Sequence, residues 1–419
     1  MARNAIVLAV LLLISAPARA QVGQVKPVAC DPRMALGGNV TFESNSGRFL
    51  KPPQGGGTVH RNAVSIVLKL GQAKIAVAID GDSADASKPN LARLDFTGQG
   101  TFDTTHVIPL VTVPRDPSSM GLIHFGPATM EVEYQGRKIP VSIYGEYQKS
   151  DYWRFLSLKV GTGLEGQCRF GSKVYPVRIL DGNGNLSAGD AVKASDGKRI
   201  GRREAGVVLT NSDGQVTCDT LVVDTGDGKF DKSVVKSMYG QPVFLDGKWY
   251  DVRLSEDRKT VSAKLLDLPT GQLKIGHDDW RILLTGKDCV LSLAGNQEPV
   301  PVPAGQYTIF NYLEQGPADK DGNRAKISSG TRDPVTYKFK TVTIPADTLT
   351  TVAIGSPITA ELKARHSGKL ASFDLKLTDA SGAAVDYVRM PSGASPDAPK
   401  FEVFDELDKS VYTTSMEYG

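Results

Sequence analysis

Short side chains that carry oxygen alternate with glycine between Asp181 and Asp190. This segment directly follows an alternating apolar run that ends at Leu180, so we expect it to form the loop after a β-strand. Calcium in proteins is bound by about six to eight oxygen atoms from carboxylates, amides, carbonyl groups and water. The sequence therefore predicts a calcium loop here, and its candidate ligands are Asp181, Asn183, Asn185, Ser187 and Asp190.

The spacing of these residues resembles the calcium loops of EF-hand and dockerin proteins. The first three candidates occupy the first, third and fifth positions of such a loop, and Ser187 would offer its carbonyl group at the seventh. The segment departs from the pattern at Leu186, which stands where the turn glycine belongs, and at Val192, which stands where the closing acid belongs. Asp190 or Asp196 would have to close the site instead.

A loop without metal is the alternative, because Asp and Asn side chains also stabilise turns by hydrogen bonds to their own backbone. Two further segments, Asp95–Asp103 and Asp224–Asp231, combine an initial Asp, spaced glycines, a Phe and a closing Asp. This recurrence favours a structural loop in which Phe102 and Phe230 are anchors.

Asp224 also permits an enzymatic interpretation. Two apolar residues followed by Asp224, Thr225 and Gly226 resemble the active-site turn of aspartic peptidases, in which two carboxylates share a proton and activate water. The mechanism needs a second aspartate, and the candidate is Asp80, which lacks the Thr-Gly or Ser-Gly that follows the aspartate in that family. The alternative function is therefore a secreted hydrolase that uses Asp224 and Asp80.

Other catalytic and metal-binding patterns are absent from the sequence. The five histidines are scattered without the spacing of a zinc site, and we find no nucleophile elbow, phosphate-binding loop or dinucleotide fingerprint. The formal net charge of the whole chain is +3. This mixed, near-neutral balance excludes the basic surface typical of nucleic-acid binding, so no nucleic-acid partner is expected.

Short alternating runs separated by turn residues predict an all-β protein. Three of them contain a turn glycine followed by a second alternating run, at Gly136, Gly171 and Asp246-Gly247, and the last is a strong hairpin signal. The segment from Lys232 to Tyr239 is the best candidate for a helix. We expect an N-terminal β domain at 21–150, a middle β domain with Asp/Asn/Gly loops at 151–285, both sandwich-like or barrel-like, and a C-terminal β-sandwich at 286–419.

The C-terminal part carries a second resemblance. Residues 300–309 read V-P-V-P-A-G-Q-Y-T-I, which is similar to a strand start in prealbumin-like sandwiches such as carboxypeptidase-regulatory and Cna-B modules. The resemblance implies an immunoglobulin-like or prealbumin-like sandwich. The turn and the alternation themselves predict that Tyr307, Ile309 and Tyr312 enter a core.

The first 20 residues have the features of a secretory signal peptide. Arg3 is followed by an apolar run, and Ala18-Arg19-Ala20 fits a cleavage site. No later stretch is long and apolar enough to cross a membrane. The four cysteines would then meet an oxidising compartment, where two disulfides are possible in three connectivities. One of these pairs Cys168 with Cys218 and Cys30 with Cys289.

These features favour an exported, non-enzymatic, multidomain β-protein stabilised by calcium. It would be periplasmic, at the cell surface or extracellular, and would bind a cell-surface or extracellular ligand. The overall layout also resembles exported bacterial β-rich proteins with Asp/Asn/Gly loops and a terminal sandwich, and this resemblance implies no activity.

Overall fold

The computed structural model describes the chain in segments between Val22 and Ser415. These segments are residues 22–34, 64–70, 73–80, 90–95, 102, 107–112, 123–134, 136–149, 154–182, 184–191, 219–231, 233–287, 289–318, 324–329, 340–367, 370–389 and 400–415. Within them the chain is almost entirely β-structure, which confirms the predicted all-β class. Their single helical element is the 3-10 helix η1 (Pro32–Met34), and none of their helices could span a membrane. The predicted signal peptide lies outside them.

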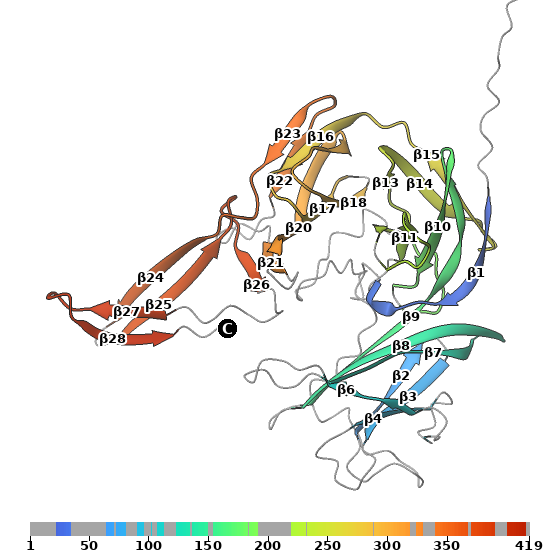
Figure 1. The fold of residues 1–419 in the computed structure, drawn as a ribbon, viewed down its shortest axis with the longest axis horizontal. Coiled ribbons are helices and arrows are strands. Elements are labelled where there is room, and N and C mark those ends of the chain that lie inside the picture. The colour runs from blue at the N-terminus through green and yellow to red at the C-terminus, as the bar shows by residue number, and fades with distance from the viewer. Residues whose placement is uncertain are drawn as a thin grey trace, which may run out of the picture.

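The largest sheet is nearly closed, like a barrel (Figure 1). Its strands follow the order β12-β11-β10-β9-β1-β15-β14-β13, and the hairpin β7–β8 with β6 continues from β9. Their bounds are β1 (Gly23–Ala29), β6 (Val111–Thr112), β7 (Ile123–Tyr134), β8 (Arg137–Lys149), β9 (Arg154–Phe170), β10 (Lys173–Leu180), β11 (Thr220–Asp224), β12 (Val234–Met238), β13 (Val243–Leu245), β14 (Lys248–Leu254) and β15 (Thr260–Leu265).

Strand β9 joins two regions because it changes partners near its middle. Its first half pairs with β8 up to Gly161, and its second half pairs with β1 and β10 from Thr162 onward. Glycines make this close packing possible: a Cβ atom at Gly161 would lie 2.1 Å from the carbonyl oxygen of Cys30, and one at Gly163 would lie 2.5 Å from that of Ile179. A side chain at either position would push a neighbouring strand away.

The first hydrophobic core lies between β7–β9 and a separate four-stranded sheet. That sheet consists of β2 (Val64–Leu70), β3 (Ala73–Asp80), β4 (Leu91–Asp95) and β5 (Val107–Pro109). The alternating residues Ile75, Val77 and Ile79 of β3 face Phe125 and other buried side chains of the opposite layer. A second core fills the barrel, with Phe170, Tyr250 and neighbouring aliphatic side chains.

The predicted hairpins are confirmed. β7 and β8 meet at Gly136, and β9 and β10 meet at Gly171, and both glycines have positive φ. The β13–β14 turn places Asp246 at φ +50° and Gly247 at φ +77°. Two consecutive positive φ angles are those of a type I′ turn, which the Asp-Gly pair favours.

The C-terminal region contains two more sheets around a third core. A three-stranded sheet is made of β16 (Thr270–Ile275), β19 (Val300–Pro303) and β23 (Leu349–Val352). A six-stranded sheet is made of β17 (Trp280–Thr285), β18 (Val290–Gly295), β20 (Gly305–Ala318), β21 (Arg324–Ser329), β22 (Thr341–Ile344) and β26 (Val385–Arg389). Tyr307, Ile309 and Tyr312 of β20 are all buried in this core, as predicted.

Two hairpins extend away from these sheets and form what we call the C-terminal arm (Figure 1). One consists of β24 (Thr359–Ser367) and β25 (Leu370–Thr378), and the other of β27 (Lys400–Phe404) and β28 (Ser410–Ser415). The rings of Phe373 and Phe401 are 4.8 Å apart and join the two hairpins.

Strand pairing crosses the expected domain ranges. β8 and β9 form a hairpin across the boundary expected at residue 150. β1 belongs to the barrel through β9 and β15, rather than to the region at 21–150. β16 and β17 belong to the C-terminal sheets, although both precede residue 286. The helix predicted at Lys232–Tyr239 is also wrong, because β12 pairs along its length with β11. The β-branched residues Val234 and Val235 suit that edge of the sheet.

The disulfides suggested by the cysteine count are not formed by the described cysteines. Cys30 and Cys168 are buried free thiols, so neither is joined to Cys289 or to Cys218, and Cys218 itself lies outside the described residues. Burial raises the pKa of each of these two thiols to about 12. Both side chains instead fill hydrophobic cores, Cys168 inside the barrel and Cys30 beside Leu180 and Val222.

Candidate functional site

Two buried aspartates meet where β10 ends and β11 begins. Leu180 and Thr220 form the last pair of that antiparallel ladder, and Asp181 and Asp219 are the next residues on each strand. Both side chains are buried, with 3% and 0% of their residue surface exposed. The backbone N–H of Asp181 also donates to the carbonyl of Thr162, at the point where β9 changes partners. The predicted loop therefore starts at the junction of two regions.

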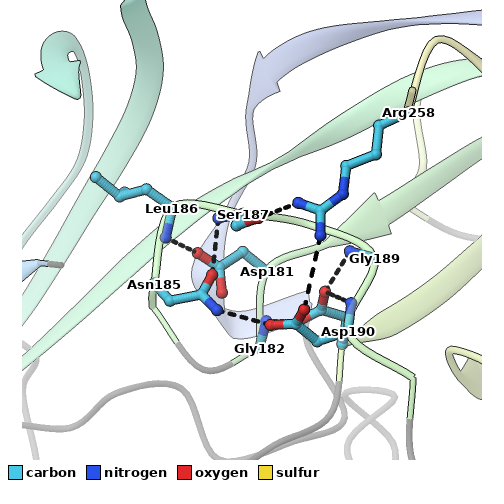
Figure 2. Close-up of polar contacts among 9 residues, drawn as sticks. Asp181, Gly182, Asn185, Leu186, Ser187, Gly189, Asp190 and Arg258 are labelled. Atoms are coloured by element: carbon cyan, nitrogen blue, oxygen red, sulfur yellow. Dashed lines mark hydrogen bonds and ion pairs between the residues drawn. The ribbon is translucent and has the colours of Figure 1, made fainter. Parts of the chain in front are cut away.

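The Asp181 carboxylate accepts hydrogen bonds from its own loop. One oxygen accepts the N–H of Gly184 at 2.7 Å. The other accepts the N–H of Leu186 at 2.7 Å (Figure 2). Leu186 has φ +63°, a conformation that is uncommon outside glycine. In this conformation its side chain is buried in the first core, whereas Ala188 is buried in the core of the barrel. The carboxylate thus stabilises a loop that contacts two cores.

The Asp219 carboxylate closes the second half of the same loop. It accepts the N–H groups of Gly182 at 2.9 Å, of Asp190 at 2.7 Å and of Gly189. Burial is the main cause that raises the pKa of Asp219, to about 8, and the nearby Asp181 carboxylate adds to the effect. The three N–H donors oppose this rise in pKa, because they stabilise the charged form of the carboxyl group.

The other predicted ligands lie in the same loop and bind one another. The side-chain amide of Asn185 donates to Asp190 at 2.6 Å, and its oxygen accepts the N–H of Ser187 at 2.8 Å. Arg258 donates to the hydroxyl of Ser187, and its guanidinium lies 3.9 Å from the Asp190 carboxylate (Figure 2). Asn183 lies outside the described residues.

This geometry has a chemical consequence for the predicted metal site. N–H groups direct partial positive charge at both Asp181 oxygens, and a guanidinium lies beside Asp190. A carboxylate oxygen has two lone pairs, so a cation here would share the Asp181 oxygens with the bound N–H donors and would approach Asp190 beside a guanidinium. In the part of the chain that is described, no three His, Cys, Asp or Glu side chains are grouped as metal ligands.

The Asp224 loop follows the same plan at the opposite end of β11. Its two oxygens accept the N–H groups of Gly226 and Phe230, each at 2.6 Å. Phe230 has φ +61° and is buried, and the Arg178 guanidinium lies 4.0 Å from the centre of its ring. Arg178 in turn forms an ion pair with Glu165 at 2.7 Å. The anchor role predicted for Phe230 is confirmed.

Asp80 and Asp224 are in different sheets. Asp80 ends β3 of the four-stranded sheet, where it forms a buried ion pair with the Nε atom of Arg93 at 2.8 Å. Asp224 ends β11 of the barrel, where its oxygens accept N–H groups. Each of the two carboxylates of the hydrolase hypothesis is therefore bound by partners of its own sheet or loop.

Two buried aspartates of the same kind were not expected from the sequence. Asp219 precedes β11, so that strand has an aspartate at each end, which is a signal that could have been recognised. Asp379 follows β25 and accepts the N–H groups of Ser381 and Ala383, each at 2.9 Å, and that of Gly355 at 3.1 Å. The contact with Gly355 spans 24 residues and leaves no local signal.

The comparisons with known proteins do not assign a function. No protein-family model matches this sequence, and neither a curated protein nor a solved structure shows significant similarity to it.

Proposed function

We propose that this chain is an exported, non-enzymatic, multidomain β-protein that binds a ligand at the cell surface or outside the cell. One observation carries the proposal: the carboxylates of Asp181 and Asp224, which suggested metal binding and catalysis, accept hydrogen bonds from the backbone of their own loops. A catalytic or ligating carboxylate needs an oxygen directed at its substrate or ion. These carboxylates direct theirs at N–H groups and hold the scaffold together.

The C-terminal arm is the binding surface that we propose. Apolar side chains are exposed along its second hairpin: Leu407 is 88% exposed, Val411 57% and Tyr412 55%. Phe404 of the same hairpin and Leu362 of β24 are also exposed. Single exposed apolar residues are common, but several on neighbouring strands are typical of a surface that is covered by a partner. A two-stranded hairpin is also marginally stable alone, which favours the same conclusion.

The test compares two purified variants with the natural chain. The arm variant carries Leu407→Ser, Val411→Thr and Tyr412→Thr, and the control carries Val174→Thr and Leu265→Thr, which replace exposed apolar residues of the barrel. Retention of each labelled protein on washed envelopes of the source organism is then measured. We expect the arm variant to lose most of its retention and the control to keep it. Equal retention of both variants would contradict the proposed surface.

Calcium binding by the Asp181 loop stays a prediction, and the contacts favour a loop that closes without an ion. The carboxylates of Asp181 and Asp219 already accept five N–H groups between them, from Gly182, Gly184, Leu186, Gly189 and Asp190. We therefore propose that calcium is not required for folding.

A further inference from the structure

The arm is attached to the sheets through a short segment, Ile354–Ser356, which we call the arm root. It lies between β23 and β24 and is held by two side chains from the sheets. His277, in the turn between β16 and β17, contacts the carbonyl oxygen of Ile354 through Nε2 at 2.8 Å. Glu314 of β20 accepts the N–H of Ser356 at 2.8 Å. These contacts join the root to the sheets, because neither side chain belongs to the arm.

Gly355 fits closely against the same group. Its φ is +83°, and a Cβ atom there would lie 2.2 Å from Oε2 of Glu314 and 2.6 Å from the ring of Tyr312. Two residues that follow β25 of the arm also bind Gly355. Asp379 accepts the Gly355 N–H, and the Ala380 N–H donates to the Gly355 carbonyl. The root therefore has little room to shift while Glu314 keeps its position.

His277 also holds Glu314. Its Nδ1 atom lies 3.3 Å from Oε1 of that carboxylate, while Nε2 faces the Ile354 carbonyl. Both partners are hydrogen-bond acceptors. A neutral imidazole has one N–H and can donate to only one of them, whereas the imidazolium donates to both. With Glu314 ionised, the two contacts can therefore be satisfied together only when His277 is an imidazolium.

The titratable and charged groups near His277 come from several elements. From β20, Glu314 is buried and Tyr312 contacts its other oxygen at 3.5 Å. Asp379 is buried in the turn after β25 and lies near Tyr312. Burial is the main cause that raises the pKa of the Tyr312 hydroxyl, and the carboxylates of Glu314 and Asp379 raise it further. Lys340 donates to the Ser381 carbonyl of the same turn. On its own turn, Asp278 is bonded to Gln297 at 2.6 Å, and the carbonyl of Asp279 accepts the N–H of Gln315.

We propose that His277 is a protonation-dependent clamp for the C-terminal arm. As an imidazolium it donates to Glu314 and to Ile354 at once and fixes the arm root. When it loses its proton, one of the two contacts is lost and the root loosens, while the sheets stay folded. The proposal does not depend on what the arm binds.

Hydrogen exchange of the root amides tests the clamp in the full-length protein. Protection of the Gly355 and Ser356 amides, corrected for the intrinsic exchange rate, is measured at about pH 5 and about pH 8.5, the range over which histidine changes charge. We expect protection at the higher pH to fall on the order of tenfold, the effect of losing one hydrogen bond. In His277→Gln the protection should be low and the same at both pH values.

The matched control is His124→Gln, since His124 belongs to β7 and packs near Tyr144 instead of the arm root. It should behave like the natural chain. Gly355→Ala should expose the root at both pH values, because the added Cβ displaces Glu314. Nitrogen-15 shifts of the His277 ring should show both nitrogens protonated at about pH 5. Equal root protection at both pH values in the natural chain, or a ring with one bare nitrogen at the lower pH, would overturn the clamp.

Discussion

Replacing Asp224 with asparagine tests whether a buried carboxylate holds its loop. The asparagine oxygen can accept one of the two N–H groups now bound at 2.6 Å, but the side-chain NH2 faces the other donor. A hydrogen bond to a charged acceptor contributes about 1.5–3 kcal/mol, and a buried donor without a partner costs about 1–3 kcal/mol. We therefore expect Asp224→Asn to lower the free energy of unfolding of the barrel by about 2–3 kcal/mol.

Native-state amide exchange of β11 and β12 is the suitable assay, because a chain of several regions need not unfold in one step. Asp227→Asn is the matched control in the same loop, since its carboxylate is 55% exposed and pairs with Lys229 at the surface. It should change the same free energy by less than about 0.5 kcal/mol. Unchanged exchange in Asp224→Asn would refute the structural role of the carboxylate. Loss of a hydrolytic activity at unchanged stability would favour the enzymatic alternative.

Two further predictions concern the Asp181 loop. Leu186→Ala removes a buried side chain from the first core and should destabilise that region by about 2–5 kcal/mol, measured by amide exchange in β3 and β7, with no comparable loss in the C-terminal sheets. The pKa of Asp219 is raised from 3.8 to about 8, so its contribution to stability is full below about pH 4 and is lost as pH rises through about 8. The thermal midpoint of the barrel should fall across this range, and Asp219→Asn should flatten the fall. A midpoint that rises with pH in the natural chain but not in the variant would reverse the assigned sign.

The parts of the fold that sequence predicts well are those set by neighbouring residues. The glycine turns at Gly136, Gly171 and Gly247 follow from φ angles that glycine adopts readily. The burial of Tyr307 and Ile309 follows from strict alternation along one strand. Such features depend on a few adjacent positions, so no partner strand has to be known.

The rest of the fold and of the site is determined by contacts between residues that are far apart in the sequence. β1 pairs with β15, more than 200 residues away, and nothing in either strand specifies that partner. The segment at 232–239 suggests a helix by itself, but pairing with β11 decides its conformation. At the site, the local hydrogen bonds of Asp181 were predicted as one of two alternatives. Those of Asp219 were not predicted, because its three donors come from a loop about 30 residues earlier in the sequence.

Thermal unfolding with and without calcium tests the central claim most directly. Ligand binding to the folded state alone raises stability in proportion to the logarithm of ligand excess, so a calcium site would show itself in the melting temperature. We measure the melting temperature of the natural chain in excess EGTA and in excess calcium, with Asp181→Asn beside it. A loop closed by its own N–H groups predicts the same melting temperature in both solutions. A higher melting temperature in calcium than in EGTA, seen in the natural chain but not in Asp181→Asn, would contradict this account and support the calcium loop.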